Sequence, residues 1–152
     1  MIYRKATLQD KDELVKLRIE FVKEAQKVTE SDKDNQLTQA LQKYFQTTIT
    51  DGSFVSWLAI KDDKIVGTSG ICFYYLPASY KNLTGKTAYI MNMYTLPDYR
   101  GRGIANKLFQ NIVNEAKNRG CARITLNATD MGRPIYSKYG FVDSHGDMVL
   151  TL

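Results

Sequence analysis

The sequence is 152 residues long, with 43% apolar residues and a formal net charge of +5. That length suits one domain with a real hydrophobic core, so residues 1–152 are expected to form a single domain. The longest apolar run, residues 71–78, is far shorter than the roughly 18 residues that a membrane-spanning helix needs. The N-terminus lacks the apolar stretch of a secretory signal, which makes a cytoplasmic protein without membrane contact the default expectation.

The positive charge is concentrated in one segment. Residues 97–140 contain eight basic and three acidic residues, while the charges of the remaining chain balance. A local excess of this kind suggests a polyanion site, although a solvated helix face explains any single charge equally well. Cys72 and Cys121 both stand in apolar segments, which indicates free thiols rather than a disulfide or a metal pair, so no metal is expected.

The first half of the chain predicts a strand followed by two helices. Residues 2–5 have the pattern of a short strand, and Thr7 with Asp10 has the spacing of a helix N-cap with an acidic third position. Apolar residues such as Leu14, Leu17 and Phe21 then recur at helical spacing and predict a helix over residues 11–26. After a polar loop at residues 29–35, the same periodicity predicts a second helix over residues 37–49.

From residue 54 onward, aromatic and β-branched residues alternate with turns. Residues 54–60, 65–76 and 87–95 are expected to form an antiparallel meander. The clearest amphipathic helix covers residues 104–119 and ends at Gly120. A strand at residues 122–128, a short helix at 134–139 and a closing hairpin of residues 141–144 and 148–152 around His145 complete the order β-α-α-β-β-β-α-β-α-β-β, a mixed α+β fold.

The junction of residues 94–106 is the most informative segment, because a strand leads into a glycine-containing turn that opens a helix. Unpaired N–H groups and the helix dipole make such a helix start an anion site, and Arg100 and Arg102 add positive charge there. The phosphate loop of nucleoside triphosphatases needs Gly-Lys-Ser or Gly-Lys-Thr, which is absent. A dinucleotide fingerprint would need glycine in place of Asn106 and a preceding parallel sheet. Both of these phosphate-binding patterns are therefore excluded.

A third pattern fits. Arg100-x-x-Gly103-x-Ala105 resembles the pyrophosphate-binding motif R/Q-x-x-G-x-G/A of the GNAT superfamily of acyl-CoA-dependent N-acyltransferases. Pro97 before the motif, the long amphipathic helix after it, and Tyr136 to Phe141, which resembles the family's Y-x-x-x-G-F, strengthen the likeness. The resemblance implies a central, mostly antiparallel and twisted sheet of about seven strands flanked by about four helices.

The resemblance also implies acetyl-CoA, or another acyl-CoA, as cosubstrate. Main-chain N–H groups of the turn and first helical residues would wrap its pyrophosphate, next to Arg100; these residues are Gly101, Arg102, Gly103, Ile104, Ala105 and Asn106. The backbone of Met93, Tyr94 and Thr95 would pair with the pantetheine arm. To admit the pantetheine arm, the strand that contains Met93 to Thr95 and the strand at residues 122–128 would splay apart.

Tyr136 matches the tyrosine that protonates the departing thiolate in many members of this superfamily. A phenol donates a proton at neutral pH without carrying charge, which suits this role. No general base can be named, because residues 87–95 contain no carboxylate. Waters held by Asn92, tyrosine hydroxyls and carbonyls suffice to neutralise an amine, so direct attack on the thioester in a ternary complex is the expected mechanism. An acyl-cysteine route has little support, because neither cysteine has a histidine near it in sequence.

The acceptor amine is poorly encoded. Related enzymes contact it with the first two helices, and residues 10–34 hold eight acidic against six basic residues, which mildly favours a cation. Tyr74, Tyr75 and Tyr80 are candidates for a cleft wall or for simple packing, and Asn92 is a candidate substrate contact. A small amine, an amino acid, an antibiotic and a protein amine all stay open as acceptors.

Two other classes of function compete with the enzyme. A catalytically silent acyl-CoA-binding regulatory domain would keep the glycine turn but would not need Tyr136, so the presence of both favours an enzyme. A nucleic-acid-binding module would use the same basic segment, yet it shows no zinc pattern, recognition motif or stripe of exposed aromatics, and nucleic acid is not the expected partner. A homodimer stays open.

Overall fold

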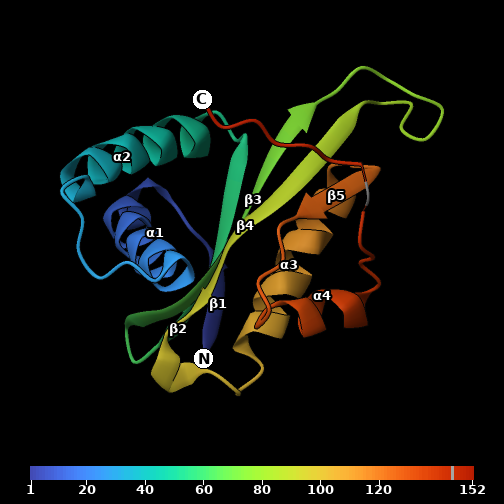
Figure 1. Cartoon of the computed structure of the whole chain (residues 1–152). Coiled ribbons are helices and arrows are strands. Elements are labelled where there is room, and N and C mark those ends of the chain that lie inside the picture. The colour runs from blue at the N-terminus through green and yellow to red at the C-terminus, as the bar shows by residue number, and fades with distance from the viewer. Residues whose placement is uncertain (145) are drawn as a thin grey trace.

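The computed structural model describes residues 1–144 and 146–152, and it shows a sheet with two helices on each face (Figure 1). The five strands are β1 (Ile2–Lys5), β2 (Phe54–Lys61), β3 (Lys64–Tyr75), β4 (Lys86–Thr95) and β5 (Arg123–Leu126). They lie side by side in chain order, antiparallel except for the parallel pair of β4 and β5. One face carries α1 (Lys11–Gln26) and α2 (Asp34–Thr50), and the other carries α3 (Ile104–Asn118) and α4 (Arg133–Tyr139).

The mixed α+β class, the helices and the meander predicted from the sequence are confirmed, but the expectation of about seven strands is wrong. No strand occurs within residues 141–144 or 146–152, and His145 of the predicted hairpin lies outside the described residues. Phe141 packs against the core of α3 and α4, but the apolar side chains after it are exposed: Val142 is 87% exposed and Met148 is 96% exposed. Strand preference depends on a partner strand and a surface to cover, and this segment finds neither within the described chain.

Each face of the sheet has its own apolar core. Against α1 and α2 the buried residues are Leu14, Val15, Phe45, Phe54 and Leu58. Against α3 and α4 they are Ile71, Ala88, Ile90, Phe109, Ile112, Val113, Ala116 and Tyr136. The strong amphipathic stripe of α3 explains why this helix crosses the middle of the sheet, since its apolar side must be buried over β2, β3 and β4. The helix thereby holds its N-terminus at the end of β4.

The start of α1 is fixed by a charged cluster. Asp10 ends a 3-10 turn, Leu8–Asp10, and its carboxylate accepts hydrogen bonds from the Thr7 backbone N–H at 2.8 Å and from both terminal nitrogens of Arg4 at 2.8 Å. The Arg4 guanidinium lowers the pKa of Asp10 to about 2. The pair therefore ties β1 to the start of α1, and the predicted capping role of Thr7 and Asp10 is confirmed.

None of the helices in the described part of the chain combines the length and apolar character needed to cross a bilayer. The described residues also contain no cluster of three or more His, Cys, Asp or Glu side chains that fits a metal ion. Cys72 and Cys121 are free and half-buried, and burial raises the pKa of both thiols.

Asp10→Asn should lower the free energy of unfolding by about 1 to 2 kcal/mol at pH 7, because a carboxylate with a lowered pKa stabilises the fold whenever it is charged. The stabilisation by the Asp10 carboxylate is fully present above the pKa of about 4 that the residue has in the unfolded chain, and it is lost as the pH falls toward 2. The unfolding free energies of the variant and the parent should therefore converge in acid. Urea denaturation at pH 7 and near pH 2.5 measures the difference. Asp12→Asn, at an exposed position of α1, is the control and should change little. An equal loss at both pH values would contradict this account.

Candidate functional site

The site begins at an interruption of β4. Asn92 has a φ of 56°, in the left-handed region, and the register with β3 shifts between Thr68 and Gly70. Ser69 is therefore the single residue opposite Asn92 and Met93, which is the arrangement of a β-bulge. Asn92 is 4% exposed, and its side-chain oxygen finds no hydrogen-bond partner among the described residues. A buried acceptor of this kind favours a ligand or water as its partner.

β4 and β5 pair only as far as Ile90 and Leu126. From Met91 onward, β4 has no neighbour on that side in the described chain, whereas its other edge still pairs with β3 at Tyr94 and Thr95. The splaying expected from the resemblance is thus present. The backbone of Met93, Tyr94 and Thr95 borders the gap, where an extended ligand can complete the ladder.

The turn after β4 opens α3. A 3-10 turn, Pro97–Tyr99, is followed by Gly101 and Gly103 with φ values of 73° and 77°, a region in which residues with a side chain are strained. A Cβ atom on either glycine would meet no protein atom within 4 Å, so these backbone positions face open space. No side chain of the described residues caps the start of α3. The N–H groups of Ile104, Ala105 and Asn106 are therefore free for an anion.

Arg100 is the most heavily bonded residue of the turn. Its Nε donates to the Thr95 carbonyl at 2.9 Å, and its Nη2 lies 2.8 Å from Oε2 of Glu24, near the end of α1. The Tyr94 hydroxyl donates to the same Glu24 oxygen at 3.2 Å. The Arg100 guanidinium lowers the pKa of Glu24, so this carboxylate is charged and a poor proton acceptor. Arg102 instead donates to the Asp98 carbonyl at 3.0 Å and stays exposed.

A cavity of about 670 Å³ joins these parts. One wall is the end of α1, with Phe21, Glu24 and Ala25, and Lys27 just after the helix. A second wall is the end of β4 and the glycine turn, with Met93, Tyr94, Thr95, Tyr99, Arg100, Gly101, Gly103, Ile104, Ala105 and Asn106. The third is α4 and the loop before it, with Thr129, Asp130, Met131, Gly132, Ile135 and Tyr136. All the predicted cofactor-binding residues except the exposed Arg102 line it, and so does Tyr136. Asn92, which is buried, does not line it, and neither do the exposed Tyr74, Tyr75 and Tyr80.

Sequence reasoning missed two walls of the cavity. One is the end of α1: the resemblance implied that the first two helices contact the acceptor, but no residue of α1 was named, because this helix carries no motif. The other is the loop before α4, where Gly132 lies under Tyr136: a Cβ on Gly132 would be 2.9 Å from the Tyr136 hydroxyl. The pairing of a glycine with a tyrosine four residues later was the signal that could have revealed this second wall.

Tyr136 lines the cavity, and its ring is packed among other aromatic rings. The residue is 7% exposed, and its ring centroid lies 5.2 Å from that of Phe109 and 6.3 Å from that of Phe141. Burial raises the pKa of Tyr136, so the phenol keeps its proton at neutral pH. A protonated tyrosine in the wall of the cavity is a suitable proton donor.

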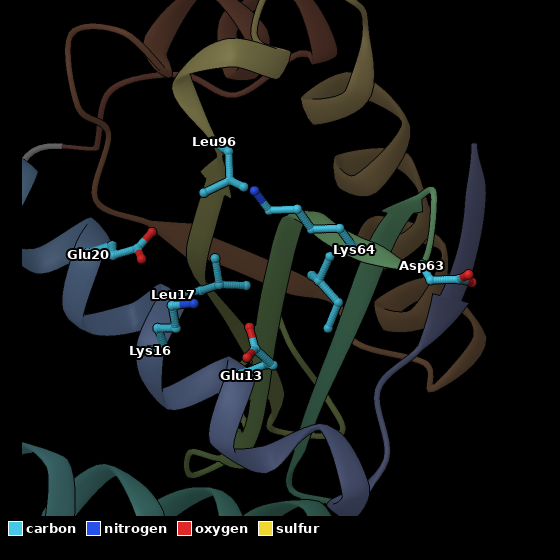
Figure 2. Close-up of a pocket in the computed structure, with 8 residues that line it drawn as sticks. Glu13, Lys16, Leu17, Glu20, Asp63, Lys64 and Leu96 are labelled. Carbon is cyan, nitrogen blue, oxygen red and sulfur yellow. The ribbon is translucent and has the colours of Figure 1, made fainter.

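A second cavity, of about 400 Å³, lies on another side of α1 (Figure 2). Its walls are Glu13, Lys16, Leu17 and Glu20 of α1, Asp63, Lys64 and Ile65 at the turn between β2 and β3, and Leu96. Figure 2 shows the Lys64 side chain extending toward Leu96. None of the sequence-predicted site residues lines this cavity, and its rim mixes both signs of charge.

Comparison with known proteins agrees with this geometry. A family model described as the acetyltransferase (GNAT) family matches residues 18–141. The chain is 38% identical to a predicted acetyltransferase from Clostridium acetobutylicum whose structure contains acetyl-CoA, with a TM-score of 0.89 and coverage of 99% of this chain and 95% of the other. A GCN5-related N-acetyltransferase from Ralstonia eutropha shares the fold, at 23% identity, a TM-score of 0.88 and coverage of 99% and 97%.

Curated proteins match over shorter stretches. The chain is 32% identical over 63 residues to thialysine N-epsilon-acetyltransferase of Mus musculus, which is 41% of this chain and 37% of that protein. It is 29% identical over 66 residues to glucosamine 6-phosphate N-acetyltransferase 1 of Oryza sativa, 43% and 40% of the two chains. The chain thus spans about two fifths of the length of these curated relatives. With the glycine turn, the splayed strands and the matching family model together, the chain belongs to the acetyltransferase (GNAT) family, whose members use acetyl-CoA as cosubstrate.

Proposed function

We propose that this protein transfers an acetyl group from acetyl-CoA to the primary amine of a small molecule, by direct attack of the neutral amine in a ternary complex. One observation carries the proposal: a single cavity contains the uncapped start of α3, the unpaired edge of β4 and the protonated hydroxyl of Tyr136. The first suits the diphosphate of acetyl-CoA, the second suits its pantetheine arm, and the third suits the sulfur that leaves in the reaction.

The residues present fit acetyl-CoA. The N–H groups of Ile104, Ala105 and Asn106, with the open space beside Gly101 and Gly103, suit a diphosphate. The unpaired backbone of Met93, Tyr94 and Thr95 suits the amide groups of the pantetheine arm, which would continue the sheet. When bound, acetyl-CoA supplies an acetyl group activated as a thioester.

Proton transfer falls to Tyr136 and to water. The buried phenol holds a proton that its hydroxyl donates to the leaving sulfur. Two carboxylates line the cavity, Glu24 and Asp130, and β4 carries none. Because Glu24 is paired with Arg100, it is a weak base. Neutralising an ammonium of pKa about 10.4 at pH 7 costs only about 4 to 5 kcal/mol, so the amine can lose its proton to solvent before attack.

The relatives support a small-molecule acceptor. Two curated relatives act, by name, on thialysine and on glucosamine 6-phosphate, both small amines. A non-catalytic acyl-CoA-binding domain is the alternative, and no observation favours it, because such a domain has no need of a buried donor at the cavity. A screen of amines with acetyl-CoA, followed by release of free thiol, separates the two. Binding of acetyl-CoA without transfer to any amine would favour the alternative.

Acetyl-CoA should raise the melting temperature of the protein, and Gly103→Asp should abolish this shift, because it sets a negative charge against the diphosphate. Gly103→Asn is the matched control: asparagine has nearly the same size and tolerates a positive φ, but it carries no charge. We therefore expect Gly103→Asn to keep measurable affinity, detected by calorimetry. Equal affinities of the two variants would show that no anion lies at the start of α3.

Tyr136→Phe should leave the affinity for acetyl-CoA nearly unchanged and lower the rate of acetyl transfer. The substitution keeps the ring that packs on Phe109 and removes only the proton donor. Loss of general acid catalysis predicts a decrease of about 10²-fold, equivalent to about 3 kcal/mol in the barrier. Single-turnover measurements exclude product release as the slow step. Equal single-turnover rates would reduce Tyr136 to a packing residue.

A homodimer belongs to the same proposal. Met148, Val149, Leu150 and Leu152 are each at least 83% exposed, and the outer edge of β5 has no partner strand in the described chain. A second copy would cover this apolar segment and pair the free edge. Light scattering should then give twice the chain mass of 17.3 kDa, and a mass of one chain would contradict the dimer.

A further inference from the structure

Arg18 lies in the middle of α1, on the side of the helix that faces the sheet and α2. Its guanidinium carbon is 5.3 Å from the ring centroid of Phe21, and the side chain is half-buried. The groups that interact with its charge are the phenols of Tyr44 on α2 and Tyr89 on β4. Arg18 is therefore enclosed by three elements, which is an unusual position for a guanidinium.

No carboxylate within residues 1–144 and 146–152 pairs with Arg18, and no hydrogen-bond acceptor contacts it. The other half-buried arginines are paired: Arg100 with Glu24 and Arg119 with Glu115. Burial lowers the pKa of Arg18, which expresses the cost of removing a cation from water. Charges that are removed from water normally gain a counter-charge, so the half-buried and unpaired guanidinium of Arg18 is suited to receive an anion.

The neighbouring tyrosines do not supply that anion. Burial raises the pKa of Tyr44 to about 12, so its hydroxyl is neutral at physiological pH, and it points to the sulfur of Met91 at 3.9 Å. Acidic residues of α1 lie elsewhere on the helix: Glu13 and Glu20 line the second cavity, and Glu24 is held by Arg100. The surplus of acidic residues in this part of the sequence therefore does not reach Arg18.

The position of Arg18 relates it to the proposed reaction. Phe21, on which its guanidinium lies, also lines the large cavity. Tyr89 precedes Asn92 by three residues in β4, which is roughly 10 Å along an extended strand. It is also one residue before Ile90, the last residue of β4 that pairs with β5. An acceptor with its amine at the bulge could thus extend along β4 and place its far end beside Arg18.

We propose that Arg18 binds an anionic group, a carboxylate or a phosphate, on the acceptor, whose amine lies several bonds away from that group. The inference rests on the proposed function and narrows its substrate class to amines that also carry a negative charge. Arginine suits this role because its planar fork donates two parallel hydrogen bonds to either anion. The Phe21 ring packs against the guanidinium, and partial burial limits its access to water.

Matched acceptors test the proposal on the full-length protein. L-lysine and 1,5-diaminopentane differ only by the carboxylate, and glucosamine 6-phosphate and glucosamine differ only by the phosphate, so the two pairs also distinguish the two anions. In at least one pair, the parent enzyme should prefer the anionic member. Arg18→Met, which keeps much of the side-chain volume, should raise KM for that member by about 10- to 100-fold and leave its neutral counterpart nearly unchanged. The KM of Arg18→Lys for the anionic member should lie between the values of the parent and of Arg18→Met.

Lys16→Met is the control, because Lys16 is an exposed cation of the same helix that lines the second cavity. Its KM values should equal those of the parent, and the affinity of Arg18→Met for acetyl-CoA should be unchanged. If Arg18→Met and the parent treat both members of each pair alike, the role of Arg18 is overturned while acetyl transfer stands. If acetyl-CoA binds but neither these four amines nor any amine of the wider screen is acetylated, both proposals fail. A loss seen with Lys16→Met instead would move the anion to the second cavity and overturn this inference.

Discussion

The bulge at Asn92 is the constraint on which the remaining site geometry depends. In a regular strand, Met91 and Met93 would lie on one face, yet Met91 packs against the α1 and α2 core and Met93 against the α3 and α4 core. The extra residue moves the side chains that follow it to the opposite faces of the sheet, and it increases the local twist of the strand. β4 can then leave β5 after Ile90 while it keeps its ladder with β3. Without this interruption the two strands would continue to pair, and the gap that exposes the backbone of Met93, Tyr94 and Thr95 would close.

The second element of the site is a contact between residues that are 76 positions apart in the sequence. Glu24 binds both Arg100 and the Tyr94 hydroxyl, and the Arg100 guanidinium also lies over the Tyr94 ring at 5.6 Å. These bonds attach the end of α1 to the glycine turn. They also neutralise part of the charge that a basic turn would otherwise present. The anion site at α3 therefore depends more on main-chain N–H groups than on the arginine side chain that marks the motif.

The sequence predicted the elements with strong periodicity and the turn with a local motif. The ranges of β1 and α1 agree residue for residue with the structure, and the turn from Arg100 to Asn106 lies where the resemblance implied. It did not predict the positive φ of Asn92, because that conformation arises from the pairing of β3 and β4 and not from the residue itself. The resemblance implied that the first two helices contact the acceptor, but the sequence did not identify Phe21 as a cavity residue, since it has the spacing of an ordinary core residue. The closing hairpin failed for a related reason: apolar residues at 148–152 indicate a strand only when another strand is available.

One helix carries both Glu24, which contacts the glycine turn, and Arg18, the residue proposed to bind the acceptor. Both residues belong to one rigid rod of 16 residues, so a ligand that draws Arg100 away from Glu24 changes the forces on the whole helix. A displacement of α1 that improves the binding of one ligand also changes the binding free energy of the other ligand. This coupling free energy is the same whichever ligand binds first. Cofactor and acceptor are therefore expected to bind cooperatively, with α1 as the mechanical link between them.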